Sequence, residues 1–429
     1  MNYYTPKVAT ALVVANMIGT GVFTSLGFQL LSLSSPIAIL ILWAIGGVCA
    51  FCGALCYAEL GSRHPASGGE YHFLTELIHP YAGFVSGAVS ATVGFAAPVA
   101  LAALTFGSYL EVALLPIDAK VSASVLIIAV VVVHSRTHLE SSAGQYYLTA
   151  LKLMLILLFI GYALIQRPEY SDQLALNDAD LFRDIFSSDA AIALIYVTYA
   201  FSGWNAATYI LGEIENPARY LPRILMIGCG LVAVVYVALN TVFLSSAPIE
   251  ALRGELEIAY VVAHYMIGPE AGFFVSLVLA GILTSTVSAM ILAGPRALQR
   301  LGEDYPRLSM LGRTNEDGIP VTAIIFMAGI SFVFLWTSTF EQILLFAGLL
   351  MAFNTFVTVI ALFVSRNRHP DKVSDLDYRM PLYPLPALLF LAITGWTLVY
   401  SASQFPLQVL VVLLALVFGL GLFKWAQGR

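Results

Sequence analysis

The sequence predicts an all-α protein that crosses a membrane many times. Of its 429 residues, 59% are hydrophobic and only 11% are charged, whereas about 25% of the residues in an average soluble domain are charged. The apolar residues form long runs, and a run of roughly 20 residues is enough for one helical span. The lysines and arginines fall on alternate loops, as the positive-inside rule requires. These three observations exclude a soluble domain, and no nucleic-acid partner is expected.

About twelve apolar runs can be separated along the chain, each a candidate span. They lie near residues 8–31, 36–60, 82–113, 119–134, 140–165, 188–212, 222–246, 260–294, 319–337, 339–364, 382–402 and 406–425. The longest polar stretches between them lie near residues 166–189, 295–318 and 365–381. None of these stretches is long enough to form a separate globular domain.

The positive charges predict the orientation of the chain. With the N-terminus inside and alternating spans, 15 of the 20 lysines and arginines fall on the inner side, four on the outer side and one, Lys152, inside a span. The inner set is Lys7, Arg63, Arg136, Arg219, Arg223, Arg296, Arg300, Arg307, Arg313, Arg366, Arg368, Lys372, Arg379, Lys424 and Arg429, and the outer set is Lys120, Arg167, Arg183 and Arg253. This asymmetry predicts an even number of spans with both termini in the cytoplasm.

The first apolar run is interrupted at its middle, where Asn16–Phe23 reads Asn-Met-Ile-Gly-Thr-Gly-Val-Phe. Gly19 and Gly21 flank Thr20, and each glycine costs about 1 kcal/mol relative to alanine in a helix interior. A helix that opens here offers free N–H groups, and the start of its second half suits a carboxylate. The alternative is that the glycines only allow close helix packing.

A second interruption falls in the middle of the sixth run, at the sequence Ala-Phe-Ser-Gly-Trp-Asn-Ala. Gly203 lies there between the bulky Phe201 and Trp204, and the polar Ser202 and Asn205 lie beside it. Two interrupted spans in corresponding halves of a chain point to the central site of a transporter. The second interruption therefore favours an opened helix over simple packing at the first one.

Lys152 is the most unusual single residue, because it lies near the centre of the run 140–165. A lysine at the middle of a bilayer costs about 2.5 to 3.5 kcal/mol on insertion scales and is functional by default. The nearest end of the span is roughly 18 Å away, too far for the side chain to reach water. The alternative is a structural lysine that binds carbonyl groups inside the helix bundle.

Two inner loops have a functional and a plain interpretation. The loop 65–71, which is rich in proline, serine and glycine, is either a re-entrant gate or an ordinary turn. Glu213 and Glu215 precede Arg219 and Arg223, and these charges form either an ion-pair latch or a solvated loop. The residues alone leave both alternatives open.

The four cysteines are interpreted as small apolar packing residues. They are Cys49, Cys52, Cys56 and Cys229, and all fall within predicted spans. No histidine or acidic cluster accompanies them apart from Glu59, so we expect no metal and no cofactor. No outer loop contains a cysteine, so no disulfide-linked single-span partner is expected.

Taken together, the motifs make the chain resemble the amino acid–polyamine–organocation superfamily, and within it the bacterial relatives of the L-type amino-acid transporters. The matching segments are Gly19–Phe23, Pro65–Tyr71, Phe201–Asn205 with Glu213–Pro217, Gly294–Arg296 and Arg379–Pro384. The resemblance implies the leucine-transporter fold, with one inverted repeat in residues 1–165, a second in 166–365 and a peripheral hairpin in 366–429. It also implies a multi-pass protein of the bacterial inner (plasma) membrane, with membrane lipid around it and an amino acid as its substrate.

The resemblance assigns roles to the two interruptions. Backbone N–H groups at residues 19–21 would bind the substrate carboxylate, and backbone carbonyls of both interruptions would bind its amino group. Tyr199 would form an aromatic gate over the site, and Asn205 would lie beside the substrate's side chain. The implied substrate-binding residues are Met17, Ile18, Gly19, Thr20, Gly21, Tyr199, Ala200, Phe201, Ser202 and Asn205.

Lys152 matches a lysine that, in sodium-independent members of the superfamily, stands where sodium-coupled relatives hold an ion. Its ammonium would bridge the first run near Gly19 and the hydroxyl groups of Thr286 or Ser288. This resemblance favours a sodium-independent secondary transporter that exchanges amino acids by alternating access. Small or medium neutral L-amino acids are expected, because no acidic residue lies mid-span in the pocket segments.

Other functions remain open at this point. A proton-coupled amino-acid symporter and a cationic amino-acid or amine antiporter would share the same fold, as would a channel or a nutrient sensor. A membrane-embedded enzyme is not expected, because no paired carboxylates and no nucleophile–base set lie at one depth.

Overall fold

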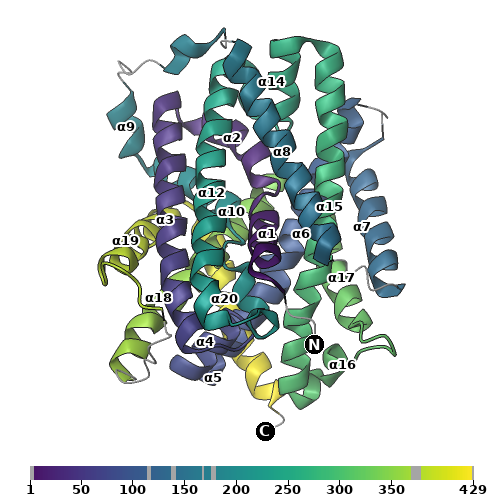
Figure 1. Ribbon diagram of the computed structural model, residues 1–429, viewed down its shortest axis with the longest axis vertical. Helices are drawn as coiled ribbons and strands as arrows, with labels where there is room; N and C mark the ends of the chain where they lie inside the picture. The colour runs from purple at the N-terminus through teal and green to yellow at the C-terminus, as the bar shows by residue number, and fades with distance from the viewer. Residues whose placement is uncertain are drawn as a thin grey trace.

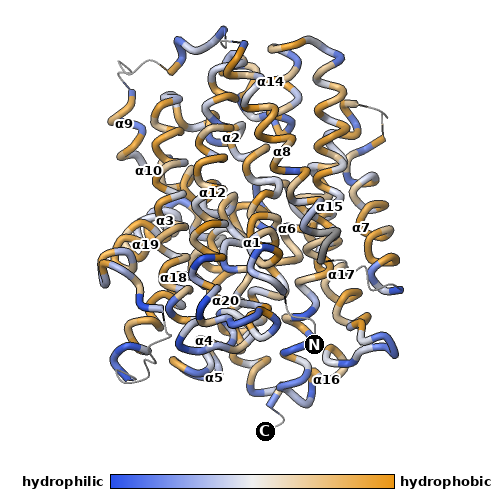
Figure 2. The backbone as a smooth tube through the Cα atoms, in the orientation of Figure 1, coloured by the Kyte–Doolittle hydropathy of each residue, from blue (hydrophilic) through white to orange (hydrophobic). Residues whose placement is uncertain are grey.

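A computed structural model describes residues 4–113, 117–136, 142–166, 169–174, 180–368 and 378–427. Over these ranges the chain is helical, apart from loops and an isolated bridge between Tyr4 and Ile214. Figure 1 shows long helices running side by side along the longest axis, with both chain termini at one end, called here the terminal end. Hydrophobic residues dominate the long helices, and hydrophilic residues gather mainly at the terminal end and in the connections (Figure 2). The prediction of an all-α polytopic membrane protein is confirmed.

Nine helical segments in the described ranges are long and apolar enough to cross a membrane. They are α1 (Pro6–Met17) with α2 (Gly21–Ser32), α3 (Pro36–Arg63), α5 (Pro80–Val89) with α6 (Phe95–Ala113), α7 (Ala119–Arg136), α8 (Ser142–Gln166), α12 (Pro217–Ser246), α15 (Pro269–Asp304), α18 (Phe340–Arg368) and α19 (Leu385–Gln404). The remaining predicted runs form α10 (Ser188–Phe201), α17 (Val321–Thr337) and α20 (Pro406–Ala426).

Short helices connect the spans. They are α4 (Glu70–Leu77), α9 (Leu181–Ile185), α11 (Ala206–Tyr209), α13 (Ile249–Leu252), α14 (Ile258–Ile267) and α16 (Ser309–Gly312). Figure 1 places α4 and α16 at the terminal end, and α9 and α14 at the opposite end. Two features differ from the predicted runs. The run 260–294 divides into α14 and α15, because Pro269 starts a new helix. The run 82–113 contains a π-helical turn at Ser90–Gly94 between α5 and α6.

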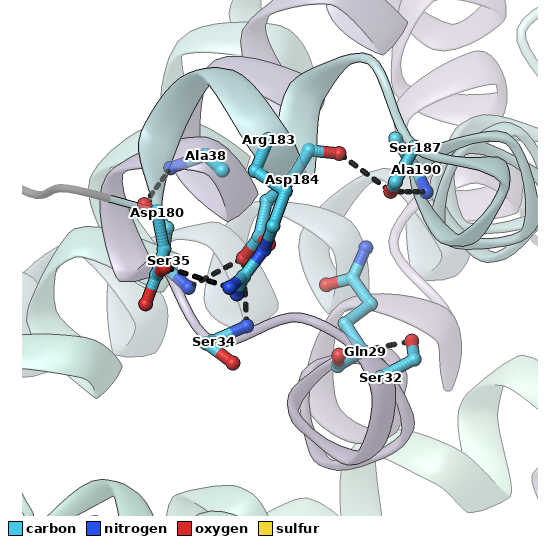
Figure 3. A network of polar contacts seen from close by, with 10 residues as sticks. All are labelled: Gln29, Ser32, Ser34, Ser35, Ala38, Asp180, Arg183, Asp184, Ser187 and Ala190. Atoms are coloured by element: carbon cyan, nitrogen blue, oxygen red, sulfur yellow. Dashed lines mark hydrogen bonds and ion pairs between the residues drawn. The ribbon is translucent and has the colours of Figure 1, made fainter.

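Helix α9, which precedes α10, is fastened to the turn between α2 and α3 by one carboxylate (Figure 3). Asp184 Oδ2 accepts hydrogen bonds from the backbone N–H groups of Ser34 at 2.7 Å and Ser35 at 2.8 Å. Its side chain is only 6% exposed, and Arg183 pairs with it at 3.3 Å. The Ser35 hydroxyl in turn accepts from Ala38 N–H and so caps α3. Asp184 therefore joins two connections that are distant in the sequence.

The division into repeats at residues 1–165 and 166–365 with a hairpin at 366–429 stays a prediction, as does the cytoplasmic location of the terminal end. Of the charges used to predict orientation, Arg167, Lys372 and Arg429 lie outside the described residues.

Candidate functional site

Both predicted interruptions are present, and they interlock near the middle of the bundle. Residues 18–20 separate α1 from α2, and residues 202–205 separate α10 from α11. A Cβ atom on Gly21 would lie 2.5 Å from Ala200 Cα, and one on Gly203 would lie 2.9 Å from the backbone of α1. Gly203 also has a φ of +92°, which side-chain-bearing residues rarely adopt. Glycine is therefore needed at both positions for the two breaks to meet.

The two breaks expose backbone hydrogen-bond donors and acceptors. At the start of α2 the N–H groups of Gly21 and Val22 have no intrahelical acceptor. Two neighbouring N–H groups are engaged, since Gly19 donates to Met17 O at 2.8 Å and Phe23 donates to Thr20 O at 2.9 Å. On the acceptor side, the Tyr236 hydroxyl lies 2.5 Å from Met17 O and 3.1 Å from Ala200 O. Tyr236 therefore ties the ends of α1 and α10 together from α12. Sequence analysis missed it, because a tyrosine within an apolar run looks like an ordinary packing residue.

Lys152 reaches the first break from α8. Its side chain is buried, and its Nζ donates to Ile18 O at 2.8 Å and to Thr286 Oγ1 at 3.1 Å. The lysine thus connects α8, the break after α1 and the middle of α15. Ser288 is not part of this contact, because its Oγ lies 2.8 Å from His134 Nε2 on α7. Two residues correspond to about 200° around a helix, which turns Ser288 away from the side that Thr286 occupies.

Tyr199 and Phe201 point to different surroundings, although both lie near the end of α10. The Tyr199 hydroxyl faces the Thr20 side chain, which places Tyr199 beside the first break. The Phe201 ring packs against Tyr236 and Trp43, with ring centroids 4.9 Å and 6.1 Å away. Phe201 can therefore contribute its backbone to the site, whereas its ring belongs to the hydrophobic core.

A small cavity of about 30 Å³ borders the second break and is lined by Ser202, Asn205 and Tyr209 among others. A larger cavity of about 350 Å³ shares Tyr209 with it and continues past Arg296. The larger cavity is lined by Arg296, Arg300 and Glu303 near the end of α15, and α15 contacts α16. Because Figure 1 places α16 at the terminal end, this cavity forms a vestibule on that side. The break region is therefore approached from the terminal end.

The opposite end is closed by contacts with the start of α18. The Phe28 ring stacks on Phe340 with centroids 5.7 Å apart. The Tyr196 hydroxyl donates to Glu341 Oε1 at 2.8 Å. These contacts join α2 and α10 to α18 on the side away from the vestibule, so the structure has an open terminal end and a closed opposite end.

The predicted ion-pair latch has a different partner. Glu213 Oε1 lies 3.2 Å from Arg296 Nη1 on α15, rather than pairing with Arg219 or Arg223. The Arg296 and Glu213 side chains are 33% and 47% exposed, so solvent screens the attraction and the pair contributes little. The latch considered from the sequence joined only residues that are close along the chain, whereas α15 reaches the loop only in the folded chain.

Glu70 is a second residue that sequence analysis missed as part of the site. It begins α4, is fully buried, and accepts from the Asn205 side-chain amide and from the Tyr57 hydroxyl at 3.1 Å. Burial raises the pKa of the Glu70 carboxyl above its usual range. The loop 65–71 therefore supports the site indirectly, because its Glu70 accepts a hydrogen bond from Asn205.

No metal or disulfide chemistry enters this picture among the described residues. No group of three or more His, Cys, Asp or Glu side chains there can hold a metal ion. The four cysteines, Cys49, Cys52, Cys56 and Cys229, are buried thiols.

Comparisons with known proteins identify the family. The family model described as "Amino acid permease" matches residues 5–423. The "Large neutral amino acids transporter small subunit 2" of Homo sapiens is 27% identical over 412 residues, which cover 93% of this chain and 75% of that protein. The "b(0,+)-type amino acid transporter 1" of Mus musculus is 26% identical over 434 residues, covering 97% and 88%. The "Cystine/glutamate transporter" of Homo sapiens is 27% identical over 387 residues, covering 88% and 76%. With its interrupted spans and this nearly full-length match, the chain belongs to the amino acid permease family and has the leucine-transporter fold expected from the sequence.

Proposed function

We propose that this protein is a sodium-independent exchanger of small or medium neutral L-amino acids. It would work by alternating access in the bacterial inner membrane, with the terminal end in the cytoplasm. The observation that carries the proposal is the contact of the Lys152 ammonium with Ile18 O and Thr286 Oγ1. The Lys152 amine binds oxygen atoms at the broken helix that a sodium ion would otherwise bind, so no sodium is needed there.

The backbone of the two breaks suits the two charged groups that every amino acid carries. The start of α2 at Thr20 and Gly21 favours a carboxylate, because helix N-termini present free N–H groups and partial positive charge. The carbonyl ends of α1 and α10, at Met17 and Ala200, favour an ammonium group. Without substrate, the Tyr236 hydroxyl binds these two carbonyl groups and holds the ends of α1 and α10 together.

A neutral substrate side chain is supported by the lining of the small cavity. No charged side chain among the described residues lines it, and its polar groups belong to Asn16, Ser202, Asn205 and Tyr209. A cationic amino acid or amine would leave its second charge without a partner in this cavity, which disfavours that alternative. The names of the relatives support amino acids as substrates, and the cavity supports the neutral class.

Uptake of labelled amino acid into proteoliposomes tests this proposal. Uptake should be unchanged when sodium is replaced by choline, and a several-fold loss would contradict the role given to Lys152. A pH gradient that drives uptake into empty vesicles would instead support the proton-coupled alternative. No disulfide-linked partner is expected, so the chain alone should be sufficient for transport.

A further inference from the structure

Glu70 is a fully buried acid that the proposed transport mechanism does not use. Its Oε1 accepts from Tyr57 and from Asn205 Nδ2, whereas its Oε2 is buried and has no hydrogen-bond partner. The Tyr209 hydroxyl faces the same carboxyl and donates to Ser90 Oγ at 3.0 Å. All of these neighbours are neutral, and Oε2 is the atom at which a proton can bind.

No cation balances Glu70 among the described residues, since none of the recorded ion pairs includes it. The titratable groups that face it are the phenols of Tyr57 on α3 and Tyr209 on α11. The other charged and titratable groups on the surrounding helices pair elsewhere: His72 with Glu76 on α4, Tyr71 on α4 with Asp304 on α15, and Glu59 on α3 with Arg63 and with Arg366 on α18.

Asn205 connects this carboxyl to the proposed substrate site. Its amide nitrogen points to Glu70, which leaves its Oδ1 for the small cavity that Asn205 lines. An ionised carboxylate can only accept hydrogen bonds, so it requires the NH₂ end of the Asn205 amide. A protonated carboxyl can also donate, and then either end of the amide can face it.

We propose that Glu70 binds a proton and thereby sets which end of the Asn205 amide faces the substrate's side chain. This inference rests on the proposed function, because it takes the small cavity to be the side-chain pocket. With Glu70 ionised, the pocket presents Oδ1 and favours a side chain that donates a hydrogen bond. With Glu70 protonated, the amide can rotate and that preference is lost. Glu70 is thus a positioning residue that makes side-chain specificity depend on pH.

The vestibule gives the proton a path from the terminal end. The backbone around Glu70 belongs to the same wall, because Gly68 and Ser67 line the vestibule together with Tyr209. The N–H groups of Gly68 and Gly69 bind the carbonyls of Tyr209 and Thr208 at 3.3 Å and 3.2 Å, which fixes α4 against the second break. Burial raises the pKa of the Glu70 carboxyl, so the switch lies above the ordinary value of about 4.3.

The test compares two probes that differ only by an ether oxygen, which can only accept a hydrogen bond, in place of a methylene group: O-methyl-L-serine and L-norvaline. Each competes for exchange of a labelled amino acid in proteoliposomes that have equal pH on both sides, from about pH 5 to about pH 8. Both probes are zwitterions over this range, so the ratio of their apparent affinities cancels pH effects on the rest of the transport cycle. The wild-type ratio should shift away from O-methyl-L-serine severalfold as pH rises, because Glu70 ionises and fixes Oδ1 in the pocket, where the ether oxygen finds no donor.

Two variants separate positioning from a general structural role. Glu70→Gln offers a donor and an acceptor at every pH, so its ratio should not change with pH. Glu76→Gln is the matched control, because Glu76 lies on the same helix with its side chain 35% exposed, and it should keep the wild-type slope. A wild-type ratio that is flat, or a Glu70→Gln slope equal to wild type, overturns the inference while leaving transport itself intact. No exchange of any amino acid at any pH would overturn the proposed function and this inference together.

Discussion

Replacing Lys152 by alanine removes a side chain that joins α8, the first break and α15 at a single atom. The ammonium donates to Ile18 O at 2.8 Å and to Thr286 Oγ1 at 3.1 Å from a buried position. Leaving such buried acceptors unpaired costs about 1–3 kcal/mol. If the contact exists in one conformation of the transport cycle and not in the other, that difference changes their population ratio by about tenfold or more.

The variant should therefore fold and insert but transport poorly, with an altered apparent affinity on the side of the vestibule. Proteoliposomes with defined orientation measure the exchange rate and the affinity from each side. Thr286→Val should give a smaller effect in the same direction, because it removes one of the two contacts and keeps the side-chain shape. Lys424→Ala, at an exposed lysine on α20, is the control for loss of a positive charge. Normal exchange and normal affinity from both sides in Lys152→Ala would refute the gating role.

Two further substitutions test the architecture that holds the site. Gly203→Ala should lower the melting temperature of the purified protein and abolish transport, because its Cβ would lie 2.9 Å from the α1 backbone at a φ of +92°. Gly161→Ala is the control, because nothing lies within 4 Å of its Cβ, and it should melt no lower than wild type. If Gly161→Ala also melted lower, the effect of Gly203→Ala would reflect a general intolerance of glycine replacement. Asp184→Ala should lower the free energy of unfolding by about 1–3 kcal/mol, because it leaves the N–H groups of the α2–α3 turn unpaired. Asp180→Ala, at a side chain that is 43% exposed, should change it little. Equal melting temperatures of these two variants would contradict the role given to Asp184.

The two breaks and Lys152 could be predicted because each violates a local rule strongly. Gly19, Gly21 and Gly203 interrupt apolar runs where helix formers are expected, and a charge at mid-span is costly enough to need a partner. The partner of Lys152 on α15 was predicted only to within one helical turn. The hydroxyls of Thr286 and Ser288 are alike in sequence, and the rotation of the helix decides which of them faces the lysine.

Tyr236, Glu70 and the Arg296 partner of Glu213 could not be predicted in the same way. A tyrosine among apolar residues satisfies every local expectation, so only the fold reveals that its hydroxyl meets two carbonyls. Glu70 follows a glycine-rich stretch that is compatible with a re-entrant gate or an ordinary turn, and its burial depends on how α4 packs against the second break. These contacts join residues far apart in the sequence, and local patterns carry no information about them.

The most direct test of the central claim measures labelled amino acid uptake into proteoliposomes that either contain unlabelled amino acid or are empty, in sodium and in choline. An exchanger whose cation site is filled by Lys152 should take up label rapidly only into loaded vesicles, and equally in both salts. Equal uptake into empty and loaded vesicles would contradict exchange. Uptake that collapses several-fold in choline would contradict the role of Lys152 as the substitute for sodium.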